Sequence, residues 1–319
     1  MKVVVTGATG HVGAALCQHL GSSGWEVVAA SRGGEQPKPA FEALPERGDV
    51  HVRALALDLA SEAVVDVLAK ELGPDVSLVH LAAWHPPATA ASTPLDRDRL
   101  IEVNVMGTLR VLDAVRAASG ARKVVYASTF EVYGIPEGPG AVSEEAATRP
   151  FSDYGATKLA GEDHLFAFTA EEGVPTVALR MPAIYGPGER VSRALPNFLR
   201  SVARGERPKI YGDGGDLRDQ LHAADAALGI ECALRGSLTG AFNLADGEAH
   251  SILALARAAL SVAGLAGEPE LLPAQKKRFD FHMSIDKIRR ELGFEPRVRL
   301  EQGMAEQLRW LRTLADSGV

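Results

Sequence analysis

The stretch MKVVVTGATGHVG, Met1–Gly13, decides the fold of this chain. Its segment Val3–Val5 is β-branched and apolar without alternation, which predicts a strand covered on both faces of a parallel sheet. Gly7, Gly10 and Gly13 follow at three-residue spacing and lead into an expected helix. Without Cβ atoms the backbone can turn tightly and bring a pyrophosphate to the helix N-terminus. The stretch predicts a dinucleotide site, and a glycine-rich turn that binds nothing is the alternative.

The composition is that of an ordinary soluble globular protein. The 319 residues are 46% hydrophobic and 24% charged, enough for one large domain or two lobes, and we expect two lobes. A net charge of -7 argues against nucleic acid as a partner. Cys17, Cys232 and the nine histidines show no metal-ligand spacing. No signal peptide or membrane-spanning run is recognisable, so we expect a cytoplasmic protein without a metal or a membrane partner.

Strands and helices alternate along the first half of the chain, which predicts parallel βαβ units in a doubly wound sheet. We expect a Rossmann-like dinucleotide-binding domain over residues 1–178, with a return segment at about 220–236. Residues 179–319 are expected to form mainly a smaller, mixed α/β substrate lobe. The further strands expected in the first domain are Trp25–Ala30, Val50–Leu57, Val76–Ala82 and Lys123–Ala127.

The ends of two expected strands bear on the cofactor. An acidic residue at the end of the second strand would bind the adenosine ribose, but Ser31 and Arg32 stand there. A hydroxyl and a guanidinium suit a 2′-phosphate, so we expect NADP(H), with NAD possible. The alternative for Arg32 is a solvated loop residue. Asp58, after the third strand, is interpreted either as an acceptor for the adenine amino group or as a helix N-cap.

Tyr154 and Lys158 are expected on one face of a helix, four residues apart. An ammonium beside a phenol favours the phenolate, so we expect a lowered tyrosine pKa and proton exchange with a substrate hydroxyl or ketone. Thr129, at the carboxyl end of the fifth strand, is placed to hydrogen-bond the same oxygen. An exposed helical pair without function is the alternative.

With these motifs in place, nearly the whole chain resembles the extended short-chain dehydrogenase/reductase family, whose members mostly modify nucleotide sugars. The resemblance implies that Thr129, Tyr154 and Lys158 are catalytic, with Glu131 as a possible base, and that Asn104 assists at the nicotinamide. The cofactor-binding residues expected on this basis are Gly7, Gly10, His11, Val12, Gly13, Ser31, Arg32, Asp58, Leu59, Leu81, Ala82, Ala83, Asn104, Tyr154, Lys158, Pro182 and Ile184.

Four residues are expected to contact the substrate: His85, Phe130, Asn197 and Arg218. His85 stands beside two prolines, so a structural turn residue is the alternative. For Arg218, which is suited to a bidentate contact with a diphosphate, the alternative is an ion pair with Asp219 or Asp225. The basic cluster at 276–278 is interpreted as a solvated face that could also neutralise phosphates.

Three departures from the family pattern refine the expected reaction. The 4,6-dehydratases place an acid where this chain has Phe130, many nucleotide-sugar enzymes place Asn where it has Ala183, and Arg32 favours NADPH. All three favour a reductase of a 4-keto-6-deoxy nucleoside-diphosphate sugar, with hydride transfer at C4. A 4-epimerase and then a 4,6- or 5,6-dehydratase remain alternatives, as does a non-catalytic dinucleotide sensor. The resemblance also implies a homodimer formed through the helices at Leu100–Ala118 and Tyr154–Glu172.

Overall fold

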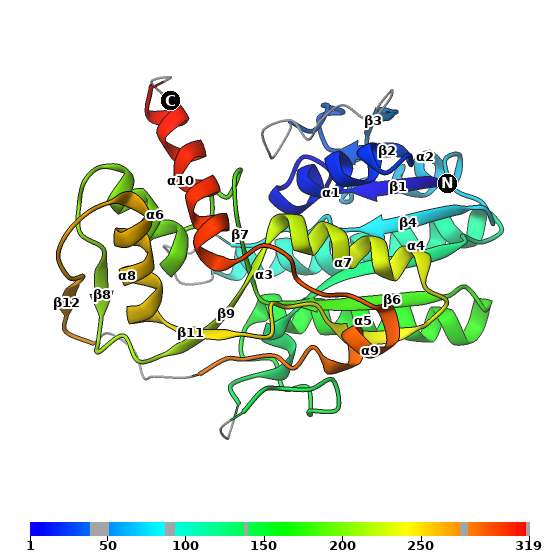
Figure 1. Cartoon of the computed structure of the whole chain (residues 1–319). Coiled ribbons are helices and arrows are strands. Elements are labelled where there is room, and N and C mark those ends of the chain that lie inside the picture. The colour runs from blue at the N-terminus through cyan, green and yellow to red at the C-terminus, as the bar shows by residue number, and fades with distance from the viewer. Residues whose placement is uncertain (39–50, 87–92, 137–139, 275–279, 317–319) are drawn as a thin grey trace.

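A seven-stranded parallel sheet forms the centre of the molecule (Figure 1). The computed structural model describes residues 1–38, 51–86, 93–136, 140–274 and 280–316. Within them the sheet has the strand order β10-β6-β5-β4-β1-β2-β3, and each neighbouring pair is parallel. This topology confirms the predicted doubly wound fold. The strands are β1 (Lys2–Thr6), β2 (Glu26–Ser31), β3 (Val52–Ala56), β4 (Val76–His80), β5 (Lys123–Thr129), β6 (Thr176–Met181) and β10 (Gly240–Asn243).

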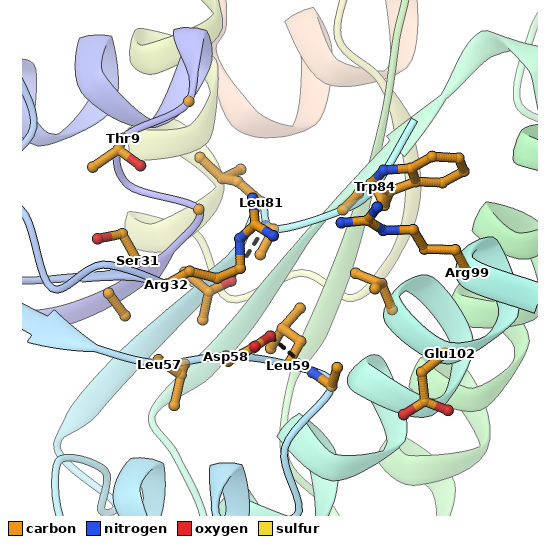
Figure 2. A pocket seen from close by; sticks show the side chains of 18 of the residues that line it. Thr9, Ser31, Arg32, Leu57, Asp58, Leu59, Leu81, Trp84, Arg99 and Glu102 are labelled. Atoms are coloured by element: carbon orange, nitrogen blue, oxygen red, sulfur yellow. Dashed lines mark hydrogen bonds between the residues drawn. The ribbon is translucent and has the colours of Figure 1, made fainter. Parts of the chain in front are cut away.

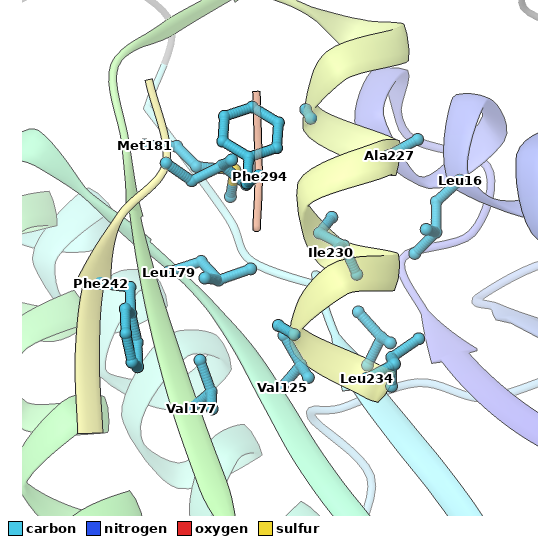
Figure 3. Packing of buried hydrophobic residues seen from close by; sticks show 14 of the residues in the cluster. Leu16, Val125, Val177, Leu179, Met181, Ala227, Ile230, Leu234, Phe242 and Phe294 are labelled. Carbon is cyan, nitrogen blue, oxygen red and sulfur yellow. The ribbon is translucent and has the colours of Figure 1, made fainter. Parts of the chain in front are cut away.

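Helices cover both faces of this sheet, which is why most residues of its strands are apolar. On one face, α1 (His11–Ser22) and α7 (Ala223–Arg235) bury Leu16 and Ile230 against the strands (Figure 3). The other face is covered by α2 (Val64–Ala69), α4 (Gly107–Ala117) and α5 (Asp153–Glu172). The carboxyl ends of the strands therefore meet at one edge, where open α/β sheets bind ligands.

Smaller elements gather beyond that edge. Two short sheets, β11-β9-β7 and β12-β8, lie with a third apolar cluster formed by α6, α8 and α10. β6 crosses the boundary expected at residue 178, and β10 returns to the large sheet. The bounds are β7 (Ala183–Tyr185), α6 (Ala194–Ala203), β8 (Lys209–Tyr211), β9 (Leu217–His222), β11 (Ala249–Ser251), α8 (Ile252–Ala263), β12 (Glu270–Leu272), α9 (Asp286–Leu292) and α10 (Leu300–Asp316).

The helix expected at Leu100–Ala118 is longer and interrupted. It begins as α3 (Pro94–Leu100), because Thr93 and Asp96 form a capping box in front of Pro94. A π-helical turn, Ile101–Met106, then connects α3 to α4. Such turns occur often at functional sites, and this one carries Asn104. None of the helices in the described ranges has the length and hydrophobicity that crossing a membrane requires.

Candidate active site

The glycine-rich turn brings α1 directly against the ends of β1 and β4. A Cβ on Gly7, whose φ is +71°, would lie 2.7 Å from the backbone nitrogen of Ala82. A Cβ on Gly13 would lie 2.2 Å from the carbonyl oxygen of Gly7. Gly10 precedes the helix and has no side chain to cap it, so the first N–H groups of α1 are open to a ligand. This cradle fits the pyrophosphate of a dinucleotide.

A pocket of about 720 Å³ opens in front of this turn (Figure 2). Its size is within the usual range for cofactor sites. The expected cofactor residues that line it are Gly7, Gly10, Ser31, Arg32, Asp58, Leu59, Leu81, Ala82 and Ala83. The expected residues outside its lining are His11, Val12, Gly13, Asn104, Tyr154, Lys158, Pro182 and Ile184. The lining also includes Trp84 and Arg99, neither of which the sequence motifs single out.

The two polar strand ends have local partners. The Ser31 hydroxyl accepts the backbone N–H of Glu35 at 3.2 Å, so it stabilises its own turn. Asp58 accepts the N–H of Ala60 at 3.2 Å, but α2 begins later, at Val64, so Asp58 does not cap that helix. Arg32 is exposed and points into the pocket (Figure 2).

Tyr154 stands near the start of α5, beside the end of β5. Burial raises the pKa of Tyr154 to about 12, and the neighbouring Glu131 carboxylate contributes to the increase. In the protein by itself the Tyr154 pKa is thus not lowered, and the lowering expected from Lys158 together with a positively charged nicotinamide ring stays a prediction. The tyrosine therefore keeps its proton at neutral pH, the form that can donate to a ketone oxygen but cannot take a proton from a hydroxyl.

Lys158 lies 1% exposed beneath the site. Its Nζ is 3.9 Å from the centroid of the Tyr126 ring, which is a cation–π contact. Burial lowers the pKa of Lys158 to about 7, although the Glu162 carboxylate opposes the shift. Glu162 itself is bound by Arg180 from β6, with Nη2–Oε2 at 2.6 Å. The base of the site is thus a network that connects α5 to two strands.

Thr129 precedes Phe130 in the chain and Glu131 follows it. Phe130 begins a 3-10 turn. The Thr129 hydroxyl accepts the Glu131 N–H at 3.4 Å. The Glu131 carboxylate accepts a hydrogen bond from Ser152, the N-cap of α5, and so stays beside Tyr154. Phe130 packs against Phe281, with ring centroids 4.5 Å apart. The position that carries an acid in the 4,6-dehydratases is therefore an aromatic wall.

Asn104 has an observed role in holding the loop after β4. Its amide oxygen accepts the Trp84 N–H at 2.7 Å, and its nitrogen donates to the Trp84 carbonyl at 2.9 Å and to Thr157 at 3.1 Å. The loop delivers His85, whose ring lies 4.6 Å from that of Tyr154. His85 is therefore in contact with the ring of Tyr154, the residue expected to be catalytic.

The other two expected substrate residues, Asn197 and Arg218, have polar partners nearby in the sequence. Asn197 is exposed on α6, where its amide oxygen accepts a hydrogen bond from Arg200 at 2.9 Å. Arg218 pairs with Asp216 at 3.3 Å, so the ion-pair alternative named the wrong partners. Asp219 and Asp225 instead accept backbone N–H groups. The basic cluster at 276–278 is outside the described residues.

His11 and the β6–β7 segment lie outside the lining of the pocket. His11 Nδ1 is 3.2 Å from the buried Glu189 carboxylate. Pro182 separates β6 from β7, and Ile184 is the middle residue of β7. These contacts connect the start of α1 to the smaller lobe.

A glycine cradle on a doubly wound sheet, with Tyr154 and Lys158 at the strand ends, defines a dinucleotide-dependent oxidoreductase of the short-chain type. The chain belongs to the NAD-dependent epimerase/dehydratase family, whose model matches residues 3–245, and it is an extended short-chain dehydrogenase/reductase. The expected family membership is thus confirmed.

Individual relatives cover nearly all of the chain. It is 31% identical to a dTDP-glucose 4,6-dehydratase of Streptomyces niveus, over 98% of this chain and 93% of that protein. It is 30% identical to an uncharacterised UDP-glucose epimerase of Bacillus subtilis strain 168, over 98% and 99%. Among solved structures, MoeE5 with UDP-glucose and NAD has a TM-score of 0.81 at 31% identity, covering 99% of this chain and 100% of that one. A UDP-glucuronic acid 4-epimerase of Bacillus cereus has a TM-score of 0.82 at 26% identity, covering 98% and 100%.

Proposed function

We propose that the protein is a nucleoside-diphosphate-sugar 4-epimerase. The observation that carries this proposal is the intact set of Thr129, Tyr154 and Lys158 beside Phe130, which cannot donate a proton. The relatives include 4,6-dehydratases and 4-epimerases. Of these two reactions, 4,6-dehydration needs a proton donor at the position of Phe130, whereas 4-epimerisation does not.

The residues have separate tasks in this reaction. Tyr154 exchanges a proton with the C4 oxygen, and the Thr129 hydroxyl holds that oxygen by a hydrogen bond. The buried Lys158 ammonium stabilises the phenolate while the proton is on the sugar. A bound dinucleotide would supply the hydride acceptor and donor for C4, and return of the hydride to the other face of the sugar would give the epimer. His85, at the ring of Tyr154, is placed to contact the sugar.

The test is turnover with UDP-glucose, UDP-glucuronic acid and dTDP-glucose, followed by separation of the C4 epimers. We expect interconversion of at least one epimer pair without net consumption of cofactor. A 4-keto-6-deoxy product would instead identify a dehydratase. Dinucleotide binding without turnover of any sugar would favour the sensor hypothesis.

Reduction of a 4-keto-6-deoxy sugar is the second candidate, and Arg32 is the observation that favours it. The guanidinium occupies the end of β2 and points into the pocket, as recognition of a 2′-phosphate requires (Figure 2). The solved structures of relatives contain NAD. Mass spectrometry of nucleotide released from freshly purified protein separates the two candidates. Retained NAD(H) supports the epimerase, whereas protein that arrives empty and prefers NADPH supports the reductase.

We also propose that the chain forms a homodimer through α3, α4 and α5. Ile101 and Met106 are 52% and 39% exposed on the continuous helix that includes the π-helical turn. Large apolar side chains exposed together on a helix face support an interface.

A further inference from the structure

Arg99 and Trp84 form a wall of the cofactor pocket that no family motif contains. Arg99 comes from α3 and Trp84 from the loop after β4. The Arg99 guanidinium carbon lies 5.2 Å from the centroid of the Trp84 ring, and both residues line the pocket. Figure 2 shows the pair across the pocket from Thr9 of the glycine-rich turn, with the guanidinium directed inward.

Hydrogen bonds hold the backbone of Trp84, whose indole ring packs against the Arg99 guanidinium. Asn104 binds both the N–H and the carbonyl of Trp84, at 2.7 and 2.9 Å. The backbone of Trp84 therefore cannot move without breaking two hydrogen bonds with a buried amide. Stacking on an aromatic face also leaves the guanidinium edge free to donate hydrogen bonds.

The charges around the pocket favour an anion at its centre. Neither Arg32 nor Arg99 forms a salt bridge within the described part of the chain, and both point into the pocket from opposite sides (Figure 2). Of the nearby carboxylates, Asp96 is bonded to Thr93 and Glu102 pairs with Arg110 at 2.6 Å. Asp98 and Asp58 line the pocket as well, and Asp58 accepts the Ala60 N–H. The two guanidiniums converge on the space in front of the open N–H groups of α1, and this arrangement favours an anion at that point although Asp58 and Asp98 also line the pocket.

We propose that Arg99, held on the Trp84 ring, binds the pyrophosphate of the dinucleotide from the side opposite the glycine-rich turn. The pyrophosphate then lies between backbone N–H groups and a guanidinium, so both of its phosphates are neutralised. Arg32 is left for the adenosine end. The inference rests on the dinucleotide cofactor of the proposed function.

The test is calorimetric titration of nucleotide-free protein with NAD⁺, NADP⁺, ADP and adenosine. In Arg99→Gln we expect binding of NAD⁺, NADP⁺ and ADP to weaken by about tenfold, the loss of one charge-assisted contact, with adenosine unchanged. Arg97→Gln is the matched control, since Arg97 is on the same helix but pairs with Asp153 outside the pocket lining. Trp84→Leu should reproduce the diphosphate-specific loss, and Trp84→Phe should recover most of it.

The other outcomes overturn the inference in distinguishable ways. Wild-type affinity for NAD⁺ in Arg99→Gln would show that Arg99 does not bind the pyrophosphate. A loss of affinity confined to NADP⁺ would assign Arg99 to the 2′-phosphate instead. An equal loss for ADP and adenosine would show that the Trp84–Arg99 pair only packs against the adenosine and does not bind the diphosphate. If the wild-type protein binds no dinucleotide, the proposed function fails together with this inference, whereas any of the preceding results leaves that function standing.

Discussion

At the scale of single residues, the Tyr154 hydroxyl is the group on which turnover depends. Because its pKa is raised to about 12, the hydroxyl is protonated at neutral pH and can donate to a C4 ketone oxygen, whereas removal of a proton from a C4 hydroxyl needs the phenolate. Tyr154→Phe should lower kcat by about 10²- to 10⁴-fold, the usual contribution of a general acid–base group. Binding of NAD⁺ should change by less than about threefold, because the phenol is outside the pocket lining. Steady-state kinetics and calorimetry measure the two effects, and an unchanged kcat would contradict the assigned role.

Glu131→Gln separates epimerisation from dehydration. The glutamine oxygen can still accept the hydrogen bond from Ser152, so the cap of α5 should survive. If the protein is an epimerase, kcat should fall by less than about threefold, since no step needs a base at this position. A dehydratase would lose about 10²-fold or more, because proton removal from C5 needs the carboxylate. The kcat values of the wild type and of Glu131→Gln are compared at saturating substrate.

The sequence predicts the neighbourhood of Tyr154 better than the contacts within it. Two residues four apart on a helix must share a face, so the proximity of Tyr154 and Lys158 to the strand ends follows from local spacing. The contact of Lys158 with Tyr126 depends on which strand packs beneath α5, and spacing along one helix carries no such information. Arg218 differs, since its partner Asp216 lies only two residues away and was still not among the expected ones.

At the scale of elements, the turn from β1 to α1 can be tested with two neighbouring glycines. A methyl at Gly13 would meet the Gly7 carbonyl oxygen at 2.2 Å, so Gly13→Ala should displace α1 and lower the melting temperature. Gly10→Ala is milder, because Gly10 has a φ of -73° and its nearest new contact is 3.2 Å away. Gly10→Ala should keep the fold and lose most dinucleotide affinity. Equal NAD⁺ affinity in Gly10→Ala and wild type would argue against the cradle.

The end of β4 should make the fold sensitive to acid. His80 is buried between Thr6, at 2.7 Å, and Thr108, at 3.1 Å. Burial, with a smaller effect of the Lys158 charge, lowers the His80 pKa from 6.5 to about 3. Between pH 6.5 and 3 the His80 side chain binds a proton in the unfolded chain but not in the native one. The contribution of the neutral, buried His80 to stability is therefore complete above pH 6.5 and is lost as the pH falls toward 3.

The free energy of unfolding should accordingly fall by up to about 1.4 kcal/mol per pH unit through this window. His80→Asn should reduce the slope, measured by urea unfolding at several pH values. Some slope should remain, because burial also lowers the pKa of His222 to about 4. An identical slope in His80→Asn and wild type would exclude His80 as a source.

Local sequence signals predict some elements closely and others not at all. The return segment expected at about 220–236 contains the long, largely apolar helix α7 (Ala223–Arg235). The three-residue strands β7, β8, β11 and β12 exist only through pairing with distant segments, and no period can be read over three residues. The Trp84–Arg99 wall is of the same kind, because it requires the loop after β4 to lie against α3.

At the scale of the whole molecule, the overall topology follows from the alternation of elements, but the location of the substrate surface does not. Asn197 has the motif position of a substrate residue, yet its side chain is occupied by Ser192 and Arg200 on an exposed face of α6. The packing of α6 against α8 and α10 determines this orientation. Apolar periodicity places α6 in the smaller lobe without fixing which of its polar residues faces the sheet edge.

The proposed dimer is the property of the whole molecule that remains to be tested. Ile101 and Met106 leave apolar surface on a helix whose other side is buried against the sheet, and a second copy of the same surface would remove it from water. Ile101→Glu combined with Met106→Glu would place two like charges on each side of a two-fold interface, so we expect a monomer by light scattering. Leu271→Glu is the matched control, because Leu271 is 56% exposed on β12, far along the chain in the smaller lobe. A wild-type monomer, or a double variant that stays dimeric, would exclude this helix face as the interface.

Since Trp84 and Arg99 adjoin the same helix, a monomeric variant that still binds NAD⁺ would also show that the cofactor wall is complete within one chain.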